Sequence, residues 1–192
     1  PLSTEGADEI PYSIEDFNID YSEVDLGVPV GFWHSVGSSY NAFFTESAID
    51  ESAHLAQKDP FDYRMKLLVG KPRFQKVLEK VAEKSKWGRS LPKGYGLGIS
   101  IHKTRGSIGG AVIEISSDSS GILTLRKAWI AIDCGKVINP NTVRAQMEGG
   151  FTFGLSAALS EEITIKNGRV EQSNFHDYPI LRLKGVPEIS VE

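Results

Sequence analysis

The side chains that could support acid–base or metal chemistry are scattered along the chain. The four histidines do not fall at the spacing of helical metal ligands, so we interpret them as structural or surface residues; they are His34, His54, His102 and His176. The single cysteine, Cys134, excludes an internal disulfide and a cysteine-cluster metal site. Glu161, Glu162 and Asp177 are carboxylates whose partners the sequence does not identify. These residue types therefore predict no catalytic residue and no metal ligand.

Patterns for phosphate and nucleic-acid binding are absent or weak. The chain has no Gly-Lys-Thr/Ser loop, and the GYGLG run at residues 94–98 opens a strand rather than a helix, which makes it a poor dinucleotide loop. Residues 71–93 hold eight basic and two acidic residues but lack the interleaved aromatics of a single-strand platform. We interpret them as the solvated side of a helix and expect no nucleic-acid partner.

A predicted helix over residues 140–159 carries the strongest signal for close approach of another group. Asn139 suits the N-cap and Pro140 the first helical position. One predicted buried stripe contains Val143, Met147, Phe151, Leu155 and Ala158, and an adjoining stripe contains Gln146, Gly149, Gly150, Phe153 and Ala157. Two adjacent glycines cost about 1 kcal/mol each relative to alanine. A neighbouring helix, the commoner case, or a bulky cofactor would explain them.

The residues before position 94 predict mainly helices. Little structure is expected over residues 1–16, a strand over 17–22, and an edge strand over 28–33 because of Pro29. A helix capped by Ser38 or Ser39 should stop near Gln57, with one stripe formed by Tyr40, Phe44, Ala48 and Leu55. Asp59-Pro60 should start a second helix, and an amphipathic third one should follow Pro72, with an apolar face of Phe74, Val77, Leu78, Val81 and Ala82.

The period changes to two after Tyr95, which predicts strands. Two of them alternate at Leu97, Ile99 and Ile101 and at Ala111, Ile113 and Ile115. In the next predicted strand the alternation of apolar residues changes phase at Arg126-Lys127, where we expect a bulge. Asn167-Gly168 predicts a hairpin. These elements indicate an α+β fold of two layers, with an antiparallel or mixed sheet packed against helices.

Length and composition suit one ordinary core: the chain has 192 residues, of which 40% are hydrophobic. No apolar run approaches 18 residues, so no membrane span is expected. Residues 1–57 contain eleven acidic residues and no Lys or Arg, which favours a solvated acidic lead-in. The chain starts without Met and stops inside a strand pattern that begins at Pro187, so we expect an internal piece of a longer polypeptide.

Three long runs resemble the molybdenum-binding large subunit of the xanthine dehydrogenase and aldehyde oxidase family, and within it the isoquinoline 1-oxidoreductase branch. They are residues 28–68 (VPVGFWHSVGSSYNAFF…), 94–117, and 133–179 (DCGKVINPNTVRAQMEGGFTFGLSAALSEEIT…). The resemblance implies that residues 1–192 are part of a molybdopterin-binding domain, with residues 1–93 as acidic lead-in, edge strands and helices. Residues 94–192 then hold the sheet, the central helix and the hairpin.

The resemblance also implies which residues approach the cofactor. In this family a pterin dithiolene, not protein side chains, holds the molybdenum. Trp33, His34, Ser35 and Val36 match a loop whose backbone amides approach the metal's ligands; most relatives carry Arg at His34, and xanthine-type enzymes carry a substrate-stacking Phe at Val36. Gln146 matches a glutamine that contacts the pterin, beside Gly149 and Gly150. The alternative for Gln146 is an amide that satisfies only a nearby buried backbone group.

The implied reaction is hydroxylation of aldehydes or N-heteroaromatic compounds with oxygen from water, with electrons passing to an iron–sulfur subunit. The catalytic glutamate of the family lies in a Gly-Gly-x-Gly-Glu-Pro-like segment beyond Glu192, so we expect the chain alone to be inactive and without cofactor. Its partners would be the rest of the large subunit, the iron–sulfur subunit and a small-molecule substrate. A non-catalytic binding or assembly domain that keeps the fold is the alternative, and cytoplasm and periplasm both remain open as compartments.

Overall fold

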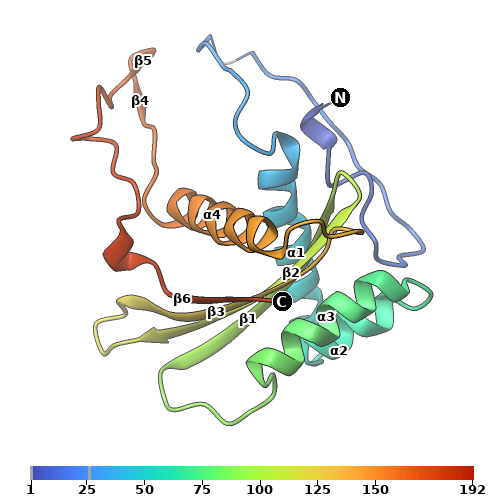
Figure 1. Ribbon diagram of the computed structural model, residues 1–192. Helices are drawn as coiled ribbons and strands as arrows, with labels where there is room; N and C mark the ends of the chain where they lie inside the picture. The colour runs from blue at the N-terminus through green and yellow to red at the C-terminus, as the bar shows by residue number, and fades with distance from the viewer. Residues whose placement is uncertain (1, 26) are drawn as a thin grey trace.

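The computed structural model describes residues 2–25 and 27–192 as four α-helices and a mixed sheet with a separate small hairpin (Figure 1). The helices are α1 (Gly37–Leu55), α2 (Pro60–Leu67), α3 (Pro72–Ser85) and α4 (Pro140–Leu159), with short 3-10 turns at Leu2–Thr4 and Leu183–Gly185. The strands are β1 (Tyr95–Thr104), β2 (Ser107–Ser117), β3 (Leu123–Asp133), β4 (Ile165–Lys166), β5 (Arg169–Val170) and β6 (Glu188–Val191). None of these helices is both long and apolar enough to cross a membrane.

The main sheet has the order β1-β2-β3-β6, in which β1, β2 and β3 are antiparallel neighbours and β6 runs parallel to β3. The register changes where Glu114 faces Lys127 and Ile115 faces Leu125, which leaves Arg126 as an extra residue on β3. This confirms the predicted bulge. The predicted hairpin is also present, because β4 pairs with β5 around Asn167-Gly168, both of which have positive φ.

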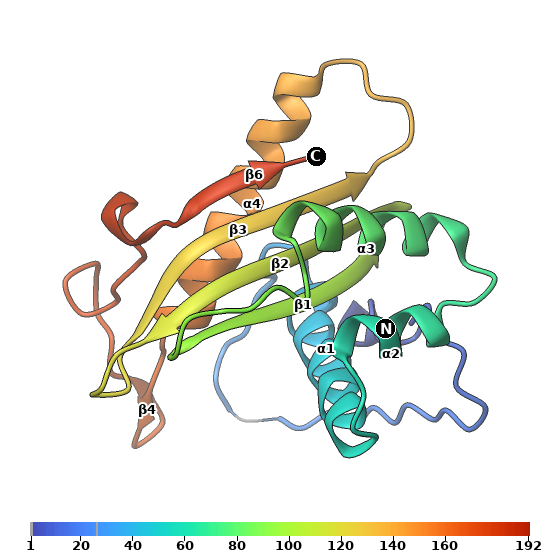
Figure 2. The same cartoon turned by 90° about the horizontal axis from the view of Figure 1, so that it is seen from below.

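Helices cover both faces of this sheet, so the α+β class and the mixed sheet are confirmed but the two-layer arrangement is wrong. Two adjacent glycines on β2 show this directly: a Cβ at Gly109 would meet Met147 of α4, and one at Gly110 would meet Val77 of α3. Successive residues of a strand point to opposite faces. Figure 2 shows α3 in front of the sheet and α4 behind it.

The core lies mainly between α3 and the sheet. Its fully or almost fully buried apolar residues come from α3 (Val77, Leu78, Val81), β1 (Ile99, Ile101), β2 (Ile108, Val112) and the end of α2 (Leu68). The amphipathic pattern of α3 is therefore confirmed. On β2 the deeply buried face is that of Ile108 and Val112, while Ala111, Ile113 and Ile115 are half-buried on the other face.

Two helix starts agree with the predicted caps and one does not. The Asp59 carboxylate accepts hydrogen bonds from the N–H groups of Phe61 and Asp62 (2.8 and 3.2 Å), and the Asn139 side chain accepts two such bonds at the start of α4. Helix α1 instead begins at Gly37, with Val36 in the N-cap position and no side-chain cap. The predicted Ser38 or Ser39 cap is wrong, since the chain enters α1 through a positive-φ turn.

The apolar stripe predicted on α1 faces outward. Tyr40, Phe44 and Leu55 are 44%, 60% and 82% exposed, and Ala48 is exposed as well. The buried side of α1 instead carries Asn41, Glu46, Ile49 and Ala53. The reason is an ion pair: Glu46 accepts a hydrogen bond from the wholly buried Arg64 of α2 at 3.0 Å, so a polar face turns inward.

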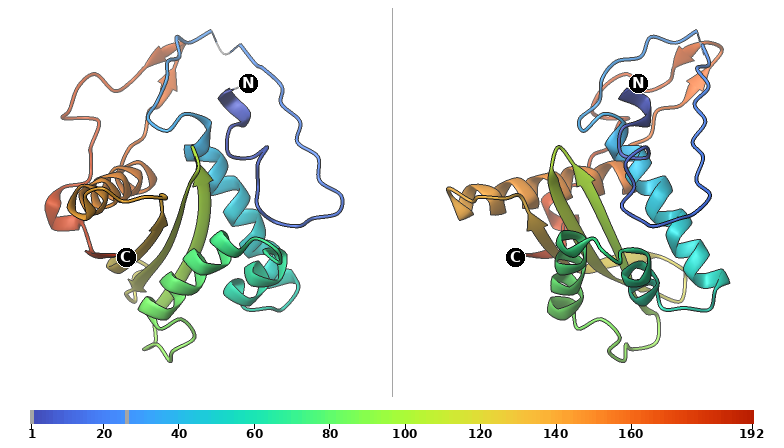
Figure 3. Two further views of the ribbon diagram at one scale, coloured as in Figure 1. Left: turned by 45° about the vertical axis from the view of Figure 1, so that its right-hand side comes forward. Right: turned by 90° about the vertical axis from the view of Figure 1, so that its right-hand side faces the viewer.

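The N-terminal segment before α1 contains neither predicted strand. Residues 17–22 and 28–33 are irregular, with Phe17 and Tyr21 about half exposed and Phe32 86% exposed. A strand needs a neighbour to satisfy its backbone groups, and the segment runs along the outside of the molecule away from the sheet (Figure 3). Residues 2–16 are more ordered than expected, since Tyr12 is buried and donates to Glu46 at 2.7 Å; Pro1 lies outside the described residues.

Candidate functional site

The loop before α1 has an unusual backbone that its own side chains stabilise. Ser35 and Val36 have φ values of 62° and 49°, which non-glycine residues rarely adopt and which are strained for a β-branched residue. The Ser35 and Ser39 hydroxyls donate to the His34 carbonyl at 2.6 and 2.9 Å, and the Val36 N–H donates to Trp33 at 3.1 Å. These bonds hold residues 33–37 as a compact turn against the first residues of α1.

Four of the five backbone donors of this loop have no acceptor. Within residues 2–25 and 27–192, no acceptor pairs with the N–H groups of Trp33, His34, Ser35 and Gly37, whereas that of Val36 is paired with Trp33. Unpaired N–H groups at the start of a helix favour a polar or anionic partner. The loop can therefore donate hydrogen bonds to a ligand at this point.

Across from the loop, α4 presents a face without side-chain bulk. A Cβ at Gly149 or at Gly150 would meet no atom within 4 Å apart from the helix itself. The interpretation that these glycines exist for packing against a neighbouring helix is therefore wrong for the described chain, because no helix of this chain approaches them. In the described residues this face of α4 is therefore open.

The loop and α4 meet around one cavity of about 200 Å³. Its lining combines the predicted residues His34, Gln146, Gly149 and Gly150 with Ala145 and Phe153. Trp33 lies beside it, because its ring is 5.3 Å from that of Phe153, centroid to centroid. Ser35 and Val36 do not line the cavity and instead shape the turn. The structure thus brings together residues more than 100 positions apart.

Gln146 is exposed and lines this cavity. No hydrogen bond to its side chain occurs in the part of the chain that the structure describes, so the alternative in which it satisfies a buried backbone group is wrong. A primary amide can donate and accept at once. Gln146 is therefore free to bind the edge of a heterocycle or an oxygen of a phosphate.

Phe153 lines the cavity, although residue types alone did not single it out. Its ring contacts both Trp33 and His34, the latter at 5.4 Å, and so connects the loop to α4. The available signal was its position on the Gln146–Gly149–Gly150 stripe, one turn beyond the glycines. Ala145 also lines the cavity but offers only a methyl group.

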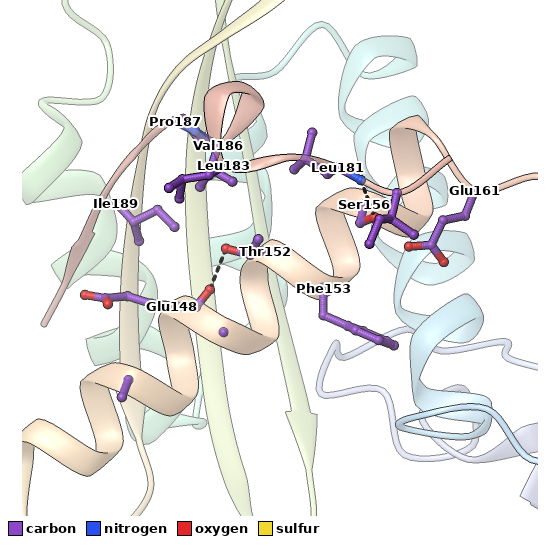
Figure 4. Close-up of a pocket in the computed structure, with 13 residues that line it drawn as sticks. Glu148, Thr152, Phe153, Ser156, Glu161, Leu181, Leu183, Val186, Pro187 and Ile189 are labelled. Atoms are coloured by element: carbon purple, nitrogen blue, oxygen red, sulfur yellow. Dashed lines mark hydrogen bonds between the residues drawn. The ribbon is translucent and has the colours of Figure 1, made fainter. Parts of the chain in front are cut away.

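A larger groove adjoins this cavity along α4. Its volume is about 790 Å³, and it runs between α4 and the segment that leads into β6 (Figure 4). Thr152 and Ser156 face Leu181 and Leu183 across it, while Phe153 points away from them. The Ser156 hydroxyl accepts the Leu181 N–H at 2.9 Å, which attaches this segment to α4. Both cavities share Gly149 and Phe153 in their linings.

The start of α4 is anchored to the rest of the molecule by Asp133, the last residue of β3. Its carboxylate accepts a hydrogen bond from Arg73 of α3 at 2.7 Å and one from the Gly135 N–H at 3.1 Å. These two donors lower the pKa of Asp133 to about 2. The charged carboxylate thus holds the turn that leads toward Asn139 and α4.

Several known proteins are similar to this chain in sequence. The chain is 36% identical over 188 residues to isoquinoline 1-oxidoreductase subunit beta of Brevundimonas diminuta, which covers 95% of this chain and 24% of that protein. It is 32% identical over 184 residues to membrane-bound aldehyde dehydrogenase (pyrroloquinoline-quinone) of Gluconacetobacter polyoxogenes, covering 84% of this chain and 24% of that protein. The chain therefore spans about a quarter of the length of these curated relatives.

A solved structure of quinoline 2-oxidoreductase from Pseudomonas putida 86 matches 45% of this chain and 11% of its own chain, with 27% identity and a TM-score of 0.43. The model of one domain family, the molybdopterin cofactor-binding domain, matches residues 79–187. That range contains β1, β2, β3 and α4, including Gln146 and the glycine pair, and it is more than half of the chain. The chain accordingly belongs to the molybdopterin cofactor-binding domain family.

Proposed function

We propose that the loop at residues 33–37 and the glycine face of α4 form part of the binding site for a molybdenum–molybdopterin cofactor. One observation carries this proposal: His34, Gln146, Gly149 and Gly150 line a single cavity, although the loop and the helix are far apart in sequence. The family model covers the helix residues, and the relatives cover the loop as well. In the same proposal, residues 1–192 constitute part of the domain, as the sequence predicts.

The residues present fit such a group. A pterin is flat and carries donors and acceptors along its edge, which suits the free amide of Gln146. The open Cβ positions of Gly149 and Gly150 allow a flat group to approach the helix backbone closely. Among the unpaired backbone N–H groups of the loop, that of His34 belongs to a residue of the cavity lining and suits an electronegative atom. The protein would thus bind the cofactor through backbone and amide groups, without metal-ligating side chains.

The chain's own contribution to a reaction is binding and orientation. The bound cofactor would supply the redox chemistry. Gln146 and the backbone amides of the loop would hold and orient the cofactor, and the paired rings of Trp33 and Phe153 would border its cavity. In the described part of the chain, no carboxylate lines the cavity. Proton transfer would therefore fall to residues outside its lining.

The activity that we infer for the whole protein is hydroxylation of an aldehyde or an N-heteroaromatic compound with water as the oxygen source. Two relatives are named for oxidation of isoquinoline and of an aldehyde, which supports these two substrate classes. An iron–sulfur subunit as electron acceptor belongs to the same proposal, supported by the naming of one relative as a subunit. A binding or assembly domain without cofactor remains the second candidate.

The test is the cofactor content of the complete gene product that carries this stretch, purified from a host that makes molybdopterin. We expect about one molybdenum per polypeptide, measured by elemental analysis, with the pterin identified by fluorescence after oxidation. Gly150→Leu should lower the molybdenum content about ten-fold, because a side chain would occupy the cofactor's place. Gly154→Leu is the matched control, since Gly154 lies on the same helix, is also open, and lines neither cavity.

Other results would contradict the proposal in distinguishable ways. A folded product with neither molybdenum nor pterin would favour the assembly domain. A product with a bound quinone and no molybdenum would follow the name of the aldehyde dehydrogenase relative instead. Equal loss of molybdenum in both glycine variants would show that damage to α4, rather than occupation of the cavity, is the cause.

A further inference from the structure

We propose that Phe153 is a positioning residue, which holds the loop at residues 33–37 against the glycine face of α4. The inference rests on the proposed function, because the loop and α4 are the two sides of the cofactor cavity. It goes beyond that function by assigning the relative placement of the two sides to one ring. Phe153 lines the cavity and is 43% exposed, and the role assigned to it is to hold the loop rather than to bind the cofactor.

The loop cannot fix its own distance from α4. In the described part of the chain, the hydrogen bonds of residues 33–37 stay within the loop or reach α1. Those bonds shape the turn and attach it to α1, but none reaches α4. Residues in strained regions of φ and ψ persist only when surrounding structure holds them in place. The bonds inside the turn shape its backbone, but a contact from outside the turn is needed to fix its place relative to α4.

Phe153 provides that contact. Its ring is 5.3 Å from Trp33 at an interplanar angle of 32° and 5.4 Å from His34 at 59°. Tilted pairs at such centroid distances are favourable beyond the area that they bury. The two contacted residues flank the first peptide bond of the turn, so one ring restrains the direction in which the loop amides point.

The same ring also fixes the spacing of the cavity. Gly149 and Gly150 lie one turn before Phe153 on the same side of α4, so the loop rests beside the open helix surface and not on it. If the ring were absent, the loop could collapse onto the glycines or swing away from them. Either movement would remove the place where the cofactor is proposed to bind.

The experiment compares Phe153→Leu, Phe153→Tyr and the control Phe175→Leu in the complete gene product. Leucine keeps an apolar side chain and is the better helix former, so α4 should remain folded. Phe175 is a 78% exposed phenylalanine outside the site. Amide hydrogen exchange of peptides that span residues 34–42 is measured by mass spectrometry, with peptides of β2 as an internal reference, and molybdenum content is measured on the same samples.

Phe153→Leu should increase the exchange of the residue 34–42 peptides about ten-fold while β2 stays unchanged, which corresponds to the loss of two ring contacts. The molybdenum content should fall as well. Phe153→Tyr should restore both values, and Phe175→Leu should alter neither. A purely structural role would instead raise exchange in β2 too.

Unchanged loop exchange in Phe153→Leu would overturn the proposal, and so would faster exchange with full retention of molybdenum. If the wild-type product contained no cofactor, the proposed function would fail, yet the exchange comparison would still decide whether Phe153 positions the loop. The two failures are therefore distinguishable, because exchange is measured without reference to the cofactor.

Discussion

At the scale of single residues, two polar side chains, Asp133 and Asn139, stabilise the connection between β3 and α4. Asp133 closes the end of β3 onto α3 through Arg73, and Asn139 accepts the first free N–H groups of the helix. Both act on the segment that carries Gln146 and the glycine pair. The contribution of Asn139 can be measured by substitution, and that of Asp133 by a pH titration.

Replacing Asn139 with Ala should lower the free energy of unfolding by about 1 kcal/mol, the usual cost of losing an N-cap. The reason is that the N–H groups of Asn141 and Thr142 lose the acceptor that now lies at 3.0 and 3.3 Å. A urea titration measures the difference. Asn141→Ala is the control and should have little effect, because its exposed side chain does not cap the helix. Equal effects of the two substitutions would show that the cap contributes nothing.

The carboxyl group of Asp133 should titrate near pH 2, because the Arg73 guanidinium and the Gly135 N–H both stabilise its charged form. A carboxyl group whose pKa is lower in the folded than in the unfolded state stabilises the fold when it is charged. This stability is fully present above the unfolded pKa, near pH 4, and is lost as the pH falls toward 2. The carboxyl-carbon chemical shift in an NMR titration gives the midpoint. Arg73→Gln should raise the midpoint of Asp133 toward the usual pKa of an aspartate. Lys80→Gln, which removes a partner from another exposed ion pair, should leave that midpoint unchanged.

At the scale of elements, α1 and α2 are held together by a buried ion pair rather than by an apolar seam. Glu46 accepts hydrogen bonds from Tyr12, from Arg64 and from the Ile101 N–H, at 2.7, 3.0 and 2.9 Å. Arg64 has no exposed surface and donates to Asp50 as well. One carboxylate therefore connects the N-terminal segment, two helices and strand β1, which places α1 and the loop that precedes it.

Glu46→Ala should destabilise the protein by about 3–5 kcal/mol, since it leaves the Arg64 guanidinium buried with its main partner removed. Chemical denaturation provides the measurement. The control is Glu83→Ala, which removes one partner of an exposed ion pair with Lys80 on α3 and should cost no more than about 1 kcal/mol. A cost for Glu46→Ala as small as that of the control would show that the buried network does not hold α1 in place.

At the scale of the whole molecule, stability is unevenly distributed between the two faces of the sheet. The α3 face contains most of the fully buried apolar side chains, whereas α4 buries only Leu155 and Ser156 among its residues. Val143, Met147 and Phe151 of its predicted buried stripe are half-buried, and Ala158 is exposed. The open face of α4 is the one that lines both cavities.

We therefore expect α4 to open locally at a lower free energy than the sheet and α3. Regions with few buried apolar contacts unfold before the global transition. Native-state hydrogen exchange should give lower opening free energies for amides near Phe151 than for those near Val112, and the difference should shrink when cofactor is bound in the complete protein. Identical opening energies for α4 and β2 would mean that the molecule unfolds as a single unit.

The sequence alone determined the features that depend on neighbours along the chain. Asp59-Pro60 and Asn139-Pro140 start helices because a side-chain cap and a fixed φ act within three residues, and Asn167-Gly168 forms its turn because both residues tolerate positive φ. The alternation after Tyr95 predicted three strands. The resemblance of long runs identified the family and the loop and helix residues of the candidate site.

The tertiary structure decided what depends on distant partners. The stripe of α1 was assigned from periodicity, but Arg64 pairs with Glu46 from another helix and turns the polar side of α1 inward. The segment 17–22 alternates like a strand, yet in the described part of the chain no strand pairs with it. In the sequence, Phe153 looks like any other aromatic residue on a helix. Only the folded chain places it against Trp33 and His34. Such contacts join residues far apart in sequence, so local patterns contain no information about them.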